Sequence, residues 1–265
     1  MDALQVIVLA LVQGLTEILP VSSSGHLILV PWLFGWPDQG LAFDVAMHMG
    51  TLAAILWYFR VEVVAYGRAW LRSFATRSLD AEARIAWALV VGTVPAVLAG
   101  LLFEDDVSST LRSASVVATT TVGYALLLGA ADRFGTKRRD ERSVGLRDAL
   151  LIGAAQALAL VPGTSRSGVT MTAGLALGLD RRGAARFSFL LSLPITAAAG
   201  VLECHELIRA ATPQPYGWMA LASLIAGLAT YATIALLLRF IQRIGMWPFV
   251  VYRLILGTAL WLALA

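Results

Sequence analysis

The chain has 265 residues, of which 58% are hydrophobic and only 14% are charged, whereas globular domains carry roughly 25% charged residues. This deficit and many apolar runs of about 20 residues predict an all-α polytopic membrane protein, and no alternating segments of the β-barrel kind occur. The net charge of +3 gives no reason to expect nucleic acid, and one cysteine, Cys204, excludes an internal disulfide and a cysteine-based metal cluster. The N-terminal run lacks Lys and Arg and already holds Gln13 and Glu17, so we do not expect a cleavable signal peptide.

The first expected element, at about 3–34, is apolar but interrupted by a polar break that begins at Pro20. Proline stops a helix, glycine relaxes the backbone, and Ser or Thr caps the helix that follows. Each half is too short to cross a bilayer, so we expect a re-entrant helix hairpin, which is tolerated where other helices or a wet cavity cover its loop. A second broken region at about 147–179 predicts another such hairpin.

Three spanning helices are expected after each hairpin. They lie at about 42–60, 84–103 and 113–132 in the first half and at about 184–206, 217–239 and 249–265 in the second.

Lys and Arg gather in alternate connections between these spans. Five arginines lie between residues 60 and 84, and six Lys or Arg lie between 133 and 147, whereas 104–112 is acidic and 206–216 holds only Arg209. The positive-inside rule places the basic connections in the cytoplasm and both termini outside. Because three crossings are an odd number, repeat 2, about 145–265, must be inverted relative to repeat 1, about 1–133, within one membrane domain of residues 1–265.

The two breaks resemble each other in sequence. A shift of 143 positions places Gln13, Ser22, Ser24 and Gly25 on Gln156, Ser165, Ser167 and Gly168. Polar side chains are expensive at membrane depth, so matched polar breaks predict one site built from two halves.

The second break, from Gly163 to Gly168, opens a half-helix. A helix N-terminus favours an anion, hydroxyls donate hydrogen bonds, and Arg166 can hold two phosphate oxygens at once. We therefore predict phosphate binding; the alternative is a structural pair in which Arg166 and Glu17 brace the two hairpins.

In the first break, Gln13 and Glu17 are four residues apart and share a helix face. Their oxygens suit Mg²⁺ or Ca²⁺ when a substrate supplies phosphate oxygens, and the alternative is a metal-free glutamate paired with Arg166. Ser23 and His26 also share a face, which would suit a nucleophile and its proton acceptor, or a proton donor. The alternatives are that the serines cap and pack, and that His26 bonds a neighbouring loop.

Three other polar features in the spans are given structural roles. Asp44 and His48 are interpreted as a structural pair, although they could line an entrance. Arg253 is explained by snorkelling toward the interface, and Thr119, Thr120 and Thr121 are expected to bond the preceding turn.

Together these residues resemble the undecaprenyl-diphosphate phosphatase family, membrane enzymes linked to bacitracin resistance. The family pattern of Glu/Gln-xxx-Glu, Pro-Val-Ser-Ser-(Ser/Thr)-Gly-His and Pro-Gly-x-Ser-Arg-Ser-Gly-x-Thr occurs here at Gln13–Glu17, Pro20–His26 and Pro162–Thr170. The resemblance implies removal of the terminal phosphate from undecaprenyl diphosphate, which yields the lipid carrier for cell-wall synthesis. It also implies a divalent cation, Mg²⁺ or Ca²⁺, and a site that opens toward the outer face of the bacterial plasma membrane.

Residue roles follow from the same resemblance. Glu17 would be the essential acid or metal ligand, Ser23 the nucleophile, His26 the base, acid or rival nucleophile, and Arg166 the clamp on the diphosphate. Gln13 would be a second metal ligand, although it cannot supply charge. The predicted substrate-binding residues lie in both breaks: Ser22, Ser24, Gly25, Gly163, Thr164, Ser165, Ser167, Gly168 and Thr170.

Two other interpretations were weighed. Membrane phosphatases of the phosphatidic-acid type need a His with an Asp four residues later, soon after their Ser-Arg. In this chain the next histidine after Arg166 is His205, and Arg209 stands in the Asp position, which argues against that family. A transporter or flippase of an anionic solute or a polyprenyl phosphate lipid would also suit an inverted repeat, because fold does not establish function. The partners expected are the polyprenyl diphosphate, membrane lipid and a second copy in a homodimer.

Overall fold

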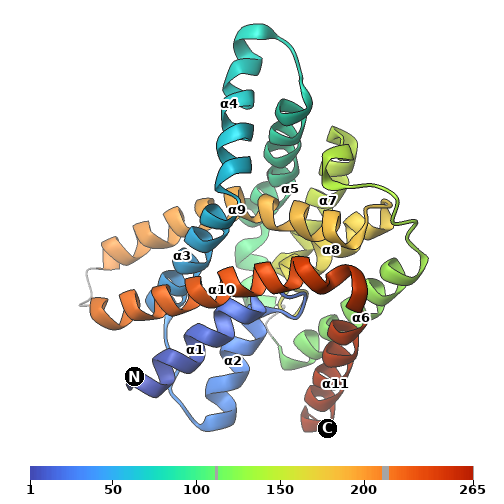
Figure 1. Ribbon diagram of the computed structural model, residues 1–265. Helices are drawn as coiled ribbons and strands as arrows, with labels where there is room; N and C mark the ends of the chain where they lie inside the picture. The colour runs from blue at the N-terminus through green and yellow to red at the C-terminus, as the bar shows by residue number, and fades with distance from the viewer. Residues whose placement is uncertain (111–112, 211–214, 265) are drawn as a thin grey trace.

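The computed structural model describes residues 1–110, 113–210 and 215–264 (Figure 1). In this part of the chain every extended regular element is a helix, so the predicted all-α class is confirmed. The helices are α1 (Ala3–Thr16), α2 (Ser23–Phe34), α3 (Leu41–Tyr58), α4 (Arg60–Thr76), α5 (Ala81–Thr110), α6 (Ala114–Phe134), α7 (Leu146–Ala157), α8 (Arg166–Ala176), α9 (Arg181–Ala210), α10 (Tyr216–Ile244) and α11 (Trp247–Leu264), with short 3₁₀ turns at Glu141–Ser143 and Leu158–Leu160.

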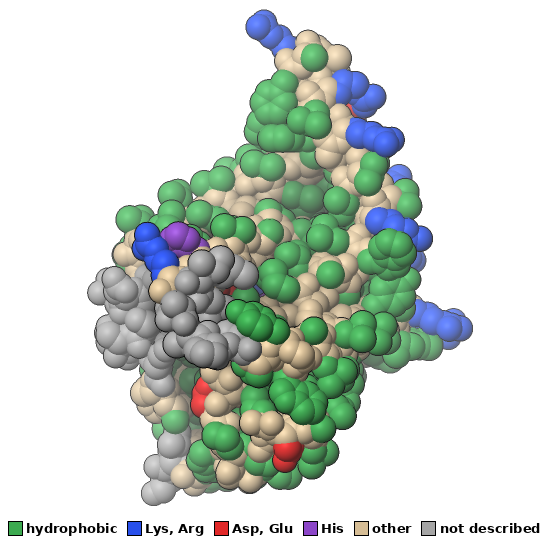
Figure 2. All heavy atoms as spheres, turned by 90° about the vertical axis from the view of Figure 1, so that its left-hand side faces the viewer, with side chains coloured by type: hydrophobic (Ala, Val, Ile, Leu, Met, Phe, Trp, Pro, Cys, Tyr) green, Lys and Arg blue, Asp and Glu red, His purple; other side chains and the backbone are tan. Residues whose placement is uncertain are grey.

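Five helices within the described residues are long and apolar enough to cross a membrane, namely Leu41–Tyr58, Ala81–Phe103, Ala114–Phe134, Arg181–Glu203 and Tyr216–Ile244. They match five of the six predicted spans, and the sixth corresponds to α11, whose apolar stretch of described residues, Trp247–Ala263, is shorter than these five. Apolar side chains cover much of the face in Figure 2, while Lys and Arg lie mainly along its upper and right-hand edges. This distribution is what a polytopic membrane protein requires.

Both broken regions form pairs of short helices. α1 and α2 are separated by Glu17–Ser22, and α7 and α8 by the segment 158–165. Pro20 and Pro162 lie in these breaks, and Ser22 and Ser165 are the residues that precede α2 and α8. The predicted breaks are therefore confirmed in position, while the inverted repeat itself stays a prediction.

Each hairpin packs against helices of the opposite half. α1 lies along α10, and α7 lies along α5. Glycine allows both contacts: a Cβ on Gly14 would lie 2.5 Å from the carbonyl oxygen of Ala226, and one on Gly153 would lie 2.2 Å from that of Gly92. α6 packs on α11, and α8 on α6 and α9, so the two loops are enclosed by helices from both halves.

The connections differ from the sequence-based expectation in two respects. Residues 60–84, expected as a connection, contain helix α4, which projects with the first turns of α5 at the top of Figure 1. The acidic segment expected as a loop at 104–112 is helical up to Thr110, and the loop expected at 206–216 is helical up to Ala210. Residues 111–112 and 211–214 lie outside the described part of the chain.

Candidate active site

The two half-helices α2 and α8 begin with the same local geometry. Ser22 and Ser165 have positive φ values of 76° and 72°, a region that costs a residue other than glycine roughly 1–3 kcal/mol. In each loop the serine hydroxyl lies 3.4 Å from that of the serine two residues later, Ser24 or Ser167. The matched sequence positions thus have matched conformations, and such strain is typical of functional loops.

A cavity of about 180 Å³ lies between the two loops. Its lining comes from both breaks and from α3: Glu17, Ser22, Ser23, Ser24, His48, Ala159, Val161, Gly163, Ser165, Arg166 and Ser167. Ser23 and Arg166 are the first residues of α2 and α8, so the positive ends of two helix dipoles meet here. This is an electrostatic environment that favours an anion.

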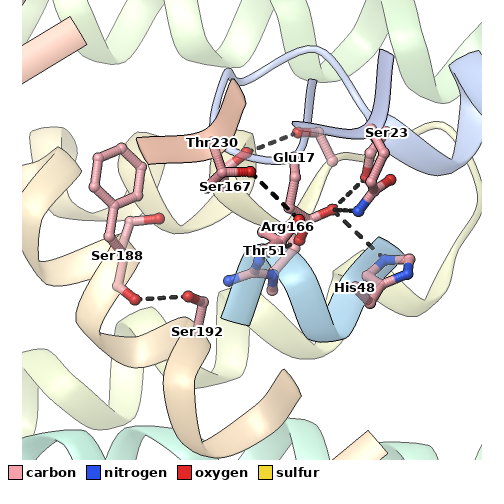
Figure 3. Close-up of polar contacts among 12 residues, drawn as sticks. Glu17, Ser23, His48, Thr51, Arg166, Ser167, Ser188, Ser192 and Thr230 are labelled. Carbon is pink, nitrogen blue, oxygen red and sulfur yellow. Dashed lines mark hydrogen bonds and ion pairs between the residues drawn. The ribbon is translucent and has the colours of Figure 1, made fainter. Parts of the chain in front are cut away.

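Glu17 is the centre of the polar network in this cavity, and Figure 3 shows Ser23, His48 and Arg166 grouped around its carboxylate. Its Oε2 accepts a hydrogen bond from Ser23 Oγ at 2.5 Å and one from Gln13 Nε2 at 3.3 Å. Its Oε1 accepts from Arg166 Nη2 at 2.5 Å, and the Glu17 side chain is only 8% exposed. The ion pair between Arg166 and Glu17, which was the alternative to phosphate binding, is therefore present.

That pair leaves Arg166 able to bind a further anion. Its side chain is 19% exposed and lines the cavity. A guanidinium has five N–H donors, and among the described residues Glu17 is the hydrogen-bond partner of Arg166. Arg166 can therefore pair with Glu17 and bind a phosphate at the same time.

The expected contact between His26 and Ser23 is wrong. His26 Nδ1 lies 2.6 Å from the carbonyl oxygen of Ser22, and Nε2 lies 2.5 Å from the hydroxyl of Tyr252, whose ring stacks on the imidazole. Both ring nitrogens are therefore engaged by the first loop and by α11, and the alternative that His26 bonds a neighbouring loop is confirmed. His26 is buried and does not line the cavity, so in this geometry it acts on the loop backbone.

The predicted substrate-binding residues divide into two groups. Ser22, Ser24, Gly163, Ser165 and Ser167 line the cavity. The other four pack behind it: Thr164 is fully buried, the hydroxyl of Thr170 pairs with that of Ser188, and Gly25 and Gly168 lie next to the serines that precede their helices.

Gln13 is also behind the cavity rather than in its lining. It is fully buried, and its amide nitrogen bonds Glu17, while its Oε1 has no hydrogen-bond partner among the residues that the structure describes. No group of three or more His, Cys, Asp or Glu that could hold a metal occurs among the described residues. The donors available to a cation at this cavity are therefore the carboxylate of Glu17 and a hydroxyl such as that of Ser23, a hard-oxygen set that suits Mg²⁺ or Ca²⁺ once phosphate oxygens join it.

The preferred interpretation of His48, a structural pair with the Asp44 side chain, is wrong, whereas the alternative that it lines an entrance agrees with its position in the cavity lining. Its Nε2 lies 3.7 Å from Glu17 Oε2, and its Nδ1 lies 2.9 Å from the backbone oxygen of Asp44, while the Asp44 carboxylate accepts from Gln39 instead. The expected pair with the Asp44 side chain is thus replaced by a place in the cavity lining. A histidine inside a spanning helix was the available signal.

The snorkelling explanation of Arg253 is also wrong. Its side chain is 1% exposed, and its guanidinium bonds backbone carbonyl oxygens of both loops and of α6. Thr119 and Thr120 bond the preceding turn as expected, and Thr120 also donates to the carbonyl oxygen of Pro162 at 2.6 Å. The expectation is wrong for Thr121, whose hydroxyl donates to the carbonyl oxygen of Gly163 at 3.5 Å. A charged residue inside an apolar helix is by itself a signal of a functional or structural site.

Comparison with known proteins gives one consistent result. The family model described as "Bacitracin resistance protein BacA" matches residues 6–259. "Undecaprenyl-diphosphatase 2" of Stutzerimonas stutzeri is 54% identical over 263 residues, which cover 98% of this chain and 97% of the relative. "Undecaprenyl-diphosphatase" of Nitrosococcus oceani is 52% identical over 98% of both chains, and that of Hahella chejuensis is 52% identical over 100% of both.

Proposed function

Because this chain belongs to the bacitracin resistance protein BacA family, we propose that it hydrolyses undecaprenyl diphosphate to undecaprenyl phosphate and phosphate. The product is the lipid carrier of cell-wall synthesis, and its recycling would account for bacitracin resistance. The observation that carries the proposal is the cavity in which Glu17, Ser23 and Arg166 meet at two helix N-termini. These are the parts that phosphoryl transfer requires: a nucleophile, a proton acceptor and fixed positive charge.

The chemistry follows from the hydrogen bonds. Ser23 Oγ donates to Glu17 Oε2, so the carboxylate is placed to accept the proton as Ser23 Oγ attacks the terminal phosphorus. The bond between that phosphorus and the bridging oxygen breaks, and undecaprenyl phosphate leaves. Water then attacks the phosphoserine, the bond between Ser23 Oγ and phosphorus breaks, and Glu17 returns its proton to Ser23 Oγ. The water oxygen leaves as part of the released phosphate, and its surplus proton passes to that phosphate or to solvent. Arg166 and the backbone N–H groups at the starts of α2 and α8 stabilise the charge on the transferred group.

The alternative is direct attack by water, with Ser23 only holding it in place. A phosphoserine at Ser23 in rapidly quenched reactions distinguishes the two pathways, because direct attack forms no covalent intermediate.

The proposal includes a divalent cation, Mg²⁺ or Ca²⁺. Glu17 would hold it together with oxygens of the substrate, and the buried Gln13 would hold Glu17 in place rather than bind the cation itself. Such a cation neutralises charge on the diphosphate.

We place the protein in the bacterial plasma membrane, with the site open toward the outer face and both termini outside. Apolar side chains on the spanning helices support insertion, and the asymmetry of basic connections supports the orientation. The prenyl chain would remain in lipid while its head group enters the cavity. A homodimer stays a prediction.

The decisive experiment measures phosphate released from undecaprenyl diphosphate by detergent-purified protein. Release that depends on the protein and on Mg²⁺ or Ca²⁺ is expected. Binding or translocation of the lipid without phosphate release would instead support the transporter or flippase interpretation.

A further inference from the structure

Arg253 of α11 is a buried cation whose partners are backbone groups. Its Nη1 donates to the carbonyl oxygens of Pro20 at 3.2 Å and Thr164 at 3.1 Å. Its Nη2 donates to Gly163 at 2.9 Å, and its Nε donates to Thr121 of α6 at 3.2 Å. No carboxylate pairs with it among the described residues, so carbonyl dipoles balance the charge.

These bonds join three separate segments at one point. Pro20 lies two residues before Ser22 in the first loop, and Gly163 and Thr164 directly precede Ser165 in the second. The loop carbonyl groups that Arg253 bonds therefore lie just before Ser22 and Ser165, the non-glycine residues with positive φ values in the two loops. Strain of this kind persists only where surrounding contacts impose it.

The last helix of the first half makes a weaker version of the same contact. Thr120 of α6 donates from its hydroxyl to the carbonyl oxygen of Pro162, which lies in the second loop only. A hydroxyl has one donor, whereas the planar guanidinium has five in a fixed arrangement, so Arg253 can bond both loops at once and Thr120 cannot.

Arg253 and Arg166 therefore have different roles at the two loops. Arg166 lines the cavity and has one described partner, whereas Arg253 is outside the lining and has four of its N–H groups committed to carbonyl oxygens. The N–H groups of Arg253 therefore bond the protein backbone rather than a ligand.

We propose that Arg253 is a positioning residue of the phosphatase site, which holds the first loop in register with the second so that Ser23 and Glu17 stay aligned with Arg166. This inference rests on the proposed function, because alignment matters only if these residues act on one phosphate. The register of the loops is itself a structural claim that can be measured without activity.

The test compares detergent-purified wild-type protein with Arg253→Lys, which keeps the positive charge but lacks the planar guanidinium and its five N–H donors. Turnover per folded molecule and hydrogen exchange of the backbone amides are measured together. We expect kcat/KM to fall roughly 10²-fold, as misplacement by about 1 Å can cause. Amide exchange should rise in both loops, about 18–25 and 161–168, and stay unchanged in the spanning helices.

Two further variants make the outcome specific. Thr120→Val should raise exchange in the second loop alone, because its bond reaches only Pro162. Arg181→Lys is the matched control: Arg181 makes a bidentate pair with Asp132 at 2.6 and 3.0 Å, away from the loops, so wild-type turnover and loop exchange are expected.

Wild-type turnover and loop exchange in Arg253→Lys would overturn the proposal. A rise in exchange throughout the protein would also overturn it, since that pattern marks a general loss of stability. If the wild-type protein released no phosphate, the proposed function would fail, while the exchange measurements would still decide whether Arg253 joins the loops.

Discussion

Glu17→Gln is the substitution that most directly tests the site. It keeps the size of the side chain but removes the charge that pairs with Arg166 and the oxygen that can take the proton of Ser23. General-base catalysis contributes typically 10²–10⁴-fold, so we expect kcat to fall by roughly that factor. The amide can still accept one hydrogen bond, so binding of the lipid should change less than turnover.

The same substitution should lower stability by a predictable amount. Removing one partner of a buried ion pair costs about 3–5 kcal/mol. Arg166 is 19% exposed to the cavity, and the glutamine oxygen can still accept from it, so about 2 kcal/mol is a better expectation. Thermal unfolding in detergent measures this loss separately from activity.

Glu62→Gln is the matched control for this change. Glu62 Oε1 accepts from Arg186 Nη2 at 2.8 Å, in an ion pair that lies outside the cavity. It should lose some stability and keep wild-type turnover when turnover is measured as phosphate release per folded molecule. Turnover of Glu17→Gln within about tenfold of wild type would refute the role of Glu17 as proton acceptor, because that role accounts for at least about 10²-fold.

Three other predictions concern the same site. Ser23→Ala should lower phosphate release at least as far as Glu17→Gln does. The double variant should be no less active than the less active single variant, because the effects of residues that act in one step are not additive. Additive losses would contradict a shared step. His26→Gln and Tyr252→Phe should each reduce kcat by only about tenfold. Their effects should not add, because Tyr252 bonds His26 and His26 bonds the Ser22 carbonyl oxygen. A loss in His26→Gln as large as that in Ser23→Ala would instead support a direct role of His26. Chelation with EDTA should abolish phosphate release, and Mg²⁺ or Ca²⁺ should restore it, whereas full activity in chelator would refute the cation.

The features that the sequence predicted well are those that depend on neighbouring residues. Apolar runs of about 20 residues become spanning helices because burial in lipid depends on composition over that length. The starts of α2 and α8 were predictable because Pro, Gly and Ser act within a few residues of their own position. α4 was not predicted because its segment contains Arg60, Arg68 and Arg72 and therefore has no apolar run of the length of a span.

The errors at the site concern partners that are distant in sequence. The spacing of Ser23 and His26 is correct, but the hydroxyl that bonds His26 belongs to Tyr252, 226 residues away. Arg253 bonds carbonyl oxygens, which every residue carries, so no side-chain pattern could reveal its partners. His48 reaches Glu17 only because of how α3 lies beside the first hairpin.

The ion pair between the loops explains how one cavity can be stable without substrate and still receive it. A buried pair contributes little net stability against a well-packed apolar pair, so Glu17 and Arg166 are better understood through function. Glu17 neutralises Arg166 when the cavity holds no anion, and a substrate phosphate offers the same guanidinium two oxygens of higher charge. Because the guanidinium has N–H groups that Glu17 does not use, we expect the phosphate to bind Arg166 beside Glu17, which would leave Glu17 Oε2 next to the Ser23 hydroxyl. One break supplies the carboxylate and the hydroxyl, and the other supplies the arginine, so a phosphate held by Arg166 would lie next to the Ser23 hydroxyl that we propose as the nucleophile.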